Sequence, residues 1–100
     1  MQIVILEQAG EEILVAHDWY ENRRRGLGFD FELCLEATLD KIILFPESYP
    51  IHYHPTRRAL VPHFPYGVFF TFSKETVFII AVFHLKRNPK TLKNTISRLH

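Results

Sequence analysis

An unbroken run of seven apolar residues, Val77 to Phe83, is the longest hydrophobic stretch in the sequence. A membrane-spanning helix needs roughly 20 such residues, so this run is far too short to cross a bilayer. Its length and its β-branched and aromatic composition are typical of a buried β-strand. We therefore expect a strand over Thr76–Leu85, with the polar residue His84 near its end.

Three more strands are predicted. Arg57–Val61 and Tyr66–Phe72 precede the apolar run and are joined to each other, and to it, by the short connections His63–Pro65 and Ser73–Glu75. Consecutive strands with short connections form an antiparallel meander. The β-branched run Ile3–Leu6 predicts a further strand, which is either buried on both sides or placed at a sheet edge.

Two amphipathic helices are expected between the first strand and the meander. The first extends from Gly10 to Arg25, and the motif Gly26-Leu27-Gly28 breaks it. The second runs from about Phe29 to Phe45, where Pro46 stops it. Apolar or semi-polar side chains repeat on one face of the first helix at the helical spacing, namely Ile13, Ala16, His17 and Tyr20. A short glycine turn between two such helices indicates a helical hairpin.

The order β-αα-βββ predicts an α+β fold, with the helical hairpin packed on a small, mainly antiparallel sheet. A chain of 100 residues that is 47% hydrophobic has room for one domain over residues 1–100. Three prolines in 46–55 indicate an ordered loop that crosses back over the structure. A short helix is expected from about Lys90 in the tail.

Charge is distributed unevenly along the chain. Ten of the 11 acidic residues lie in the first 50 positions, and eight of the 12 lysines and arginines lie in the second 50. This asymmetry suggests a basic face for an anionic partner, although two solvated faces of opposite sign would give the same counts. The N-terminus lacks the features of a signal peptide, so we expect a cytoplasmic protein. Cys34 has no internal disulfide partner and suits a buried helix face.

Several kinds of chemistry are not supported by any motif. His52 and His54 could share a face, but no Cys, Asp or Glu stands at a companion spacing, so no metal site is predicted. The serines lie in no nucleophile-elbow motif. Gly26-x-Gly28 is not followed by the Lys-Ser/Thr pair of a phosphate-binding loop. We therefore expect no metal and no cofactor.

The remaining candidate site is the basic end of the meander. His84 ends the buried strand, and Lys86-Arg87-Asn88-Pro89 follow it directly. A polar side chain at the end of an apolar strand is held in a fixed direction, which favours a functional role. The alternative is structural, with His84 closing the strand and Arg87 pairing with an acidic helix residue such as Glu12 or Asp18.

The sequence resembles the RelE/ParE toxin superfamily over nearly its whole length, and most closely the ParE-like, plasmid-stabilisation branch. Each matching motif is short, but their order and spacing together are specific. The motifs are Tyr20-Glu21, Gly26-Leu27-Gly28-Phe29-x-Phe31, Phe45-Pro46-x-x-Tyr49-Pro50, Arg57-Arg58, Phe64-Pro65-Tyr66, Ala81-Val82-Phe83-His84 and Arg87-Asn88-Pro89.

The resemblance implies the toxin of a type II toxin–antitoxin pair, with two alternative targets. RelE-like toxins cleave messenger RNA on the ribosome without a metal, which requires a base, an acid and cations on the phosphate. Arg58 and Arg87 fall on two cationic positions of that set, but Leu60 and Gly67 replace two others, and no tyrosine follows Tyr66. Cleavage by His84 with Arg58 and Arg87 would be the enzymatic alternative.

ParE-like toxins resemble binding modules that inhibit DNA gyrase by protein contact. We favour this non-catalytic alternative because most of the RelE set is missing. The resemblance also implies a cognate antitoxin with an acidic, partly disordered segment, and either a homodimer or a toxin–antitoxin hetero-oligomer. The residues expected to bind the target are Arg57, Arg58, His84, Lys86 and Arg87.

Overall fold

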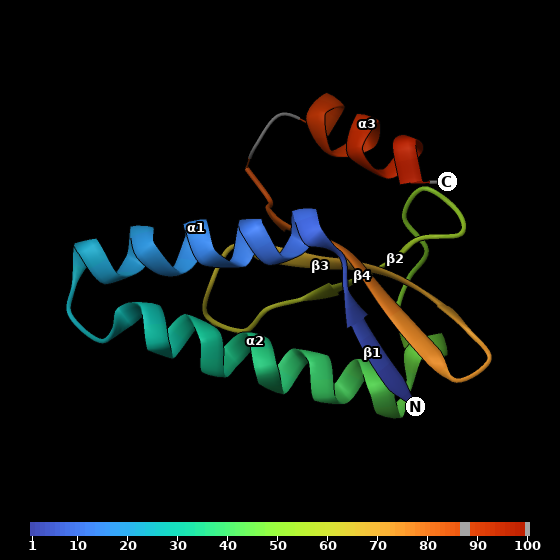
Figure 1. Ribbon diagram of the computed structural model, residues 1–100, viewed down its shortest axis with the longest axis horizontal. Helices are drawn as coiled ribbons and strands as arrows, with labels where there is room; N and C mark the ends of the chain where they lie inside the picture. The colour runs from blue at the N-terminus through green and yellow to red at the C-terminus, as the bar shows by residue number, and fades with distance from the viewer. Residues whose placement is uncertain (87–88, 100) are drawn as a thin grey trace.

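A computed structural model describes residues 1–86 and 89–99 of the chain (Figure 1). The predicted helices and strands are all found, with ends shifted by a few residues. The first helix begins at Glu7 rather than at Gly10, and the second begins at Leu27 rather than at Phe29. The elements are β1 (Gln2–Ile5), α1 (Glu7–Arg23), α2 (Leu27–Leu44), a 3-10 turn (Pro46–Ser48), β2 (Arg57–Leu60), β3 (Tyr66–Ser73), β4 (Thr76–His84) and α3 (Pro89–Leu99).

The sheet has four strands in the order β1-β4-β3-β2. The expected antiparallel meander of β2, β3 and β4 is confirmed. β1 lies at the edge and runs parallel to β4, from the pair Gln2 and Thr76 to the pair Ile5 and Ile79. Val4 and Ile5 are exposed, so β1 is an edge strand and is not buried on both sides. The first strand of the chain is thus held by the last.

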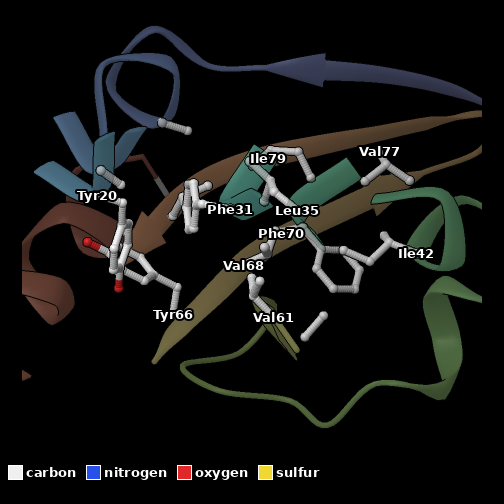
Figure 2. Close-up of a cluster of buried hydrophobic side chains, with 14 residues drawn as sticks. Tyr20, Phe31, Leu35, Ile42, Val61, Tyr66, Val68, Phe70, Val77 and Ile79 are labelled. Atoms are coloured by element: carbon white, nitrogen blue, oxygen red, sulfur yellow. The ribbon is translucent and has the colours of Figure 1, made fainter. Parts of the chain in front are cut away.

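The helical hairpin of α1 and α2 covers one face of the sheet (Figure 1). Apolar side chains of both helices meet those of β3 and β4 in a continuous core (Figure 2). Its aliphatic part includes Ile42, Val77 and Ile79. Its aromatic end is formed by Tyr20, Phe31, Phe64 and Tyr66, whose ring centroids lie 4.9 to 6.1 Å apart.

The tight turn between the helices depends on two glycines in different ways. Gly26 has φ of +89°, a left-handed conformation that favours glycine. Gly28 was expected to break the helix, but it lies inside α2. A Cβ atom there would stand 2.6 Å from the carbonyl oxygen of His17, so Gly28 allows the two helices to approach closely. The hairpin prediction is confirmed, and the role assigned to Gly28 is corrected.

The start of α2 is capped by a side chain from α1. The carboxylate of Glu21 accepts hydrogen bonds from the backbone N–H groups of Gly26, at 2.9 Å, and Gly28, at 3.0 Å. These N–H groups have no partner within the helix, and a carboxylate also suits the positive end of the helix dipole. The hydrogen bond from Gly26 is the main cause that holds the pKa of Glu21 below its ordinary value.

The opposite face of the sheet is covered in part by α3, which confirms the expected tail helix. Leu92 and Ile96 of α3 pack against Phe69, Ile80 and Phe83. A β-bulge makes this possible: Phe69 pairs with Ala81 and Phe70 with Ile79, which leaves Ile80 unpaired and turned toward the α3 side. Among the described helices, none is long and apolar enough to cross a membrane.

Candidate functional site

His84 is the last residue of β4, as the sequence predicted. The backbone of this strand end is fixed from α1, because the carboxylate of Glu12 accepts a hydrogen bond from the N–H of Val82 at 2.9 Å. The pairing of β1 with β4 stops at Ile79. Beyond it, the Glu12 side chain, and not a neighbouring strand, accepts the hydrogen bond from the backbone of β4. Glu12 thereby positions β4 two residues before His84.

The imidazole of His84 has a defined orientation. Its Nδ1 atom accepts a hydrogen bond from the backbone N–H of Lys86, at 3.1 Å. The ring also packs edge-on against Tyr66, with centroids 5.1 Å apart. Because Nδ1 acts as the acceptor, the neutral ring carries its proton on Nε2. In the neutral ring, Nε2 is therefore the donor atom of His84.

A cavity of about 340 Å³, here called the aromatic pocket, opens beside His84 between α1 and the end of the sheet. Tyr20 and Tyr66 lie together at this end of the core, away from Ile42 (Figure 2). Burial, and secondarily the neighbouring Tyr66, raises the pKa of Tyr20, so its hydroxyl stays protonated. The lining residues are Val15, Trp19, Tyr20, Tyr66, His84 and Lys86.

A smaller cavity of about 210 Å³, here called the basic hollow, also has His84 in its wall. Arg58 lies in it, and the Nε atom of Arg58 is buried without a hydrogen-bond partner among the described residues. Burial and the charge of Arg58 lower the pKa of His52, a lining residue from the loop before β2. Apolar and aromatic side chains complete the wall: Tyr53, Phe69, Phe83, Leu85 and Leu92.

Arg57 and Arg58 are adjacent in β2 but are placed in different surroundings. The guanidinium of Arg57 donates to the backbone carbonyls of Tyr49, at 2.7 Å, and Glu47, at 3.1 Å. Its central carbon also lies 5.6 Å from the ring centroid of Phe72. Arg57 therefore anchors the loop before β2, whereas Arg58 lines the hollow beside His84.

The other predicted site residues are only partly brought together. Lys86 is exposed and lines the aromatic pocket. Arg87, expected to bind the target or to act with His84, lies outside the described residues. Lys74 and Lys86 follow opposite ends of the β3–β4 hairpin, so these two basic residues lie apart. The site that the structure assembles is therefore His84 with Arg58 on one side and Lys86 on the other.

Leu60 and Gly67 stand where RelE-like toxins are expected to carry cationic residues, and the structure shows the surroundings of both. Leu60 is 57% exposed at the outer strand β2. A Cβ atom at Gly67 would lie 3.1 Å from side-chain atoms of Leu85 and Phe69, and 3.3 Å from Cδ of Arg58. Gly67 is thus enclosed by the residues that form the hollow, and a long side chain would not fit there without displacing them.

Sequence reasoning missed two residues of this region. His52 was considered only as a metal ligand, and Trp19 was not considered. Trp19 is the only tryptophan of the chain, which the composition alone shows. Its side chain is 51% exposed, as is typical of a binding surface. Among the residues that the structure describes, no group of three His, Cys, Asp or Glu side chains could hold a metal ion.

The arrangement of the elements can now be compared with known proteins. The sequence matches no protein-family model and no curated protein. Its fold is similar to that of a solved structure described as the chromosomal ParDE TA (toxin–antitoxin) system from P. aeruginosa, with a TM-score of 0.76. The similarity covers 86% of this chain and 97% of the other, at 10% sequence identity.

The chain belongs to the class of α+β domains in which a helical hairpin packs on a four-stranded sheet. Within that class, this chain shares its fold with the matched chain of the ParDE TA system. The fold expected from the resemblance in the sequence is therefore confirmed. At 10% identity the likeness establishes architecture, and the biological role is argued separately.

Proposed function

We propose that this chain is the toxin of a type II toxin–antitoxin pair, that it arrests growth by binding DNA gyrase, and that a cognate antitoxin neutralises it. The observation that carries the proposal is the ParE-like fold, which extends over 97% of the similar chain. The family motifs at the hairpin turn and at the end of β4 have structural counterparts in the close helix contact at Gly28 and in the fixed position of His84.

The preference for gyrase rests on the surroundings of His84. Metal-free RNA cleavage needs a proton donor, a proton acceptor and cations around one phosphate. Leu60 and Gly67 provide neither charge nor a proton. Arg57 is engaged with backbone carbonyls away from the hollow. A protein-binding inhibitor needs no such set, so it is the simpler function for this surface.

Ribosome-dependent messenger RNA cleavage is the second candidate, and one observation favours it. Arg58 and His84 line the same hollow, and His52 stands beside them. A guanidinium next to an imidazole could hold a phosphate and move a proton. This candidate would make the chain a metal-independent endoribonuclease.

Growth on expression is the first test. The full chain, produced from an inducible promoter, should arrest growth, and co-expression of the neighbouring reading frame should restore it. An antitoxin of the expected kind has an acidic tail that folds on binding. Normal growth at full expression of folded protein would remove the toxin assignment and leave a structural or operator-binding partner of the antitoxin.

Two assays with the purified chain separate the targets. Gyrase and relaxed plasmid should show a loss of supercoiling and an accumulation of cleaved DNA. Programmed ribosomes should show intact messenger RNA. Codon-specific cleavage on ribosomes together with unaffected supercoiling would refute gyrase as the target and establish the second candidate.

Variants at the site link either activity to its residues. His84→Ala and Arg87→Ala should weaken growth arrest while the thermal midpoint stays nearly unchanged. Leu33→Ala is a suitable control, because this exposed side chain on α2 lies outside the aromatic pocket and the basic hollow. Loss of folding in the His84 or Arg87 variant would instead assign that residue a structural role.

A further inference from the structure

The strand β1 is an open edge of the sheet, beside β4 (Figure 1). Three of its four residues, Gln2, Val4 and Ile5, are exposed, so the helices leave most of the strand uncovered. It carries no charge and no proline, which are two of the devices that keep an edge from pairing with another chain. An apolar edge of this kind is a template for a further strand.

The opposite edge of the sheet, β2, is better protected. The N–H of Arg58 donates to the carbonyl oxygen of Pro50 at 3.0 Å, and Ile51 forms an antiparallel bridge with Arg57. The loop before β2 thus covers the start of this edge, which also carries the two arginines. The sheet therefore offers β1 as its edge for pairing, and pairing of β1 with itself closes at two chains instead of continuing as a fibre.

The hydrogen bonds to β4 determine which backbone groups of β1 point outward. The N–H groups of Gln2 and Leu6 donate to carbonyl oxygens of β4 and of the turn before it, at 2.6 and 3.0 Å. Backbone groups alternate in direction along a strand, so the N–H and C=O groups of Ile3 and Ile5 point away from β4. No other described segment hydrogen-bonds to the backbone of these two residues. They are the groups that a further strand would meet.

The surroundings of β1 favour an uncharged partner. Glu7 directly follows the strand, Glu75 lies beside its start, and both are exposed. At the same corner, Glu47 lines an apolar cavity of about 520 Å³ with Met1 and Phe45. These carboxylates repel the acidic segment expected of an antitoxin, whereas an apolar strand without charge fits between them. β1 of a second copy is such a strand, and its own Glu7 lies beyond the residues that would pair.

We propose that β1 pairs antiparallel with β1 of a second copy and so joins the two sheets of a two-fold symmetric dimer. Ile3 of each copy lies opposite Ile5 of the other, and each such pair exchanges its N–H and C=O groups. Val4 lies at the two-fold axis, in the closer pair whose Cα atoms are about 4.5 Å apart. This side chain is 39% exposed in the single chain, and the contact covers it. The pairing requires neither gyrase nor an antitoxin.

The mass of the purified full chain in solution is the first test. Sedimentation equilibrium should show reversible association from 11.8 kDa to twice that mass. Val4→Lys should raise the dimer Kd by about tenfold or more, because it places two like charges directly opposite each other. Leu33→Lys is the matched control: this side chain is 65% exposed beside the hairpin turn, and the variant should dimerise like the unchanged chain. Circular dichroism verifies that both variants are folded.

Cysteine cross-linking tests the register of the pairing. Val4→Cys places two thiols across the two-fold axis, at a Cα separation that a disulfide spans. Oxidation with copper–phenanthroline should therefore give a covalent dimer on a non-reducing gel. Gln2→Cys is the control on the same strand and face, because its two copies would lie about 13 Å apart along the strands. The unchanged chain reports any background from Cys34.

The proposal is overturned if the chain stays monomeric up to its solubility limit, if Val4→Lys dimerises as tightly as Leu33→Lys, or if Gln2→Cys cross-links as readily as Val4→Cys. A chain that is monomeric alone but cross-links through Val4→Cys to the product of the neighbouring reading frame would assign the edge to that protein instead. These outcomes are independent of the toxin assignment. A dimer that does not arrest growth would uphold the pairing and refute the proposed function, and a monomer that arrests growth would do the reverse.

Discussion

The two faces of the sheet are built differently. On the hairpin face, large side chains such as Phe31 and Phe70 are fully buried, and Glu12 and Glu21 each accept hydrogen bonds from backbone N–H groups. On the α3 face, the cluster is smaller, and beside it lies a hollow in which the Nε atom of Arg58 has no partner among the described residues. The hairpin face therefore has the larger buried cluster, and the α3 face has the hollow that holds Arg58.

This difference indicates on which face a substitution should change stability and on which it should change binding. A tightly packed layer loses contacts with every removed atom. The α3 layer has a smaller buried cluster and so fewer contacts to lose, and its hollow holds Arg58, which can bind another group. Changes on the hairpin face should alter folding, and changes at the hollow should alter binding.

Phe31→Ala should have the largest effect. Its ring is fully buried and lies 5.1 to 5.6 Å from the rings of Tyr20, Phe64 and Tyr66. Removal of a buried phenyl ring costs about 4 kcal/mol in the free energy of unfolding. Urea denaturation measures this loss. A cost below about 1 kcal/mol would mean that the hairpin face does not dominate stability.

Gly28→Ala should follow, with a loss of about 3 kcal/mol from overpacking. The added methyl group would stand 2.6 Å from the backbone oxygen of His17, which belongs to the facing helix. Gly10→Ala is the matched control: its nearest neighbour would be 4.0 Å away, and alanine is the better helix former. Thermal unfolding should therefore show opposite signs for the two substitutions, and equal signs would disprove the close-contact role of Gly28.

Leu92→Ala tests the other face and should cost less, about 2 kcal/mol. Leu92 is a buried residue of α3 that also borders the hollow, so part of its surface has no packing partner to lose. Urea denaturation of this variant beside Phe31→Ala compares the two layers directly. A loss equal to that of Phe31→Ala would erase the distinction between the faces.

Glu21 gives a pH-dependent contribution on the hairpin face. Its pKa is lowered in the folded chain, so its stabilisation is complete above the ordinary pKa and is lost as pH falls through the lowered pKa. Glu21→Gln should therefore show a flatter decline in the unfolding midpoint than the unchanged chain as the pH falls below about 5, and equal slopes above it. Parallel slopes for the two proteins would show that the cap has no such role.

Arg58→Met should change stability least. The substitution removes a buried nitrogen without a partner, so the free energy of unfolding should change by less than about 0.5 kcal/mol. Removal of the charge should also raise the pKa of His52, which an NMR titration measures. The control is Arg57→Met, which breaks hydrogen bonds to two carbonyls and should cost about 1.5 kcal/mol. If Arg58→Met were the more damaging of the two, the hollow would be structural.

Local pattern was sufficient for most of the fold. Helical spacing in Ile13 to Tyr20 and the apolar run of β4 each report on their own neighbourhood, so these elements were predicted with small errors at their ends. The parallel pairing of β1 with β4 could not be predicted in the same way, because its partners are more than 70 residues apart and carry no local signal. The role of Gly28 was misinterpreted because the residue that requires a glycine there, His17, belongs to the other helix.

The site was predicted less completely. His84 was identified because a strand end fixes its direction, and Arg57 was grouped with Arg58 because they are neighbours in sequence. The alternation of side chains along a strand predicts that adjacent residues point to opposite faces, so the different surroundings of Arg57 and Arg58 could have been predicted. His52 enters the hollow from an irregular loop, where no periodicity indicates which residue turns inward.

The pairing of β1 with β4 also has a consequence for the order of events during synthesis. Gln2–Ile5 leave the ribosome first, but their partners are Thr76–Ile79, so the sheet closes only when most of the chain has emerged. Until then the hairpin has no sheet to cover, and His84, which follows those partners, is not yet in place. A nascent chain from which β4 has not yet emerged is therefore without its site.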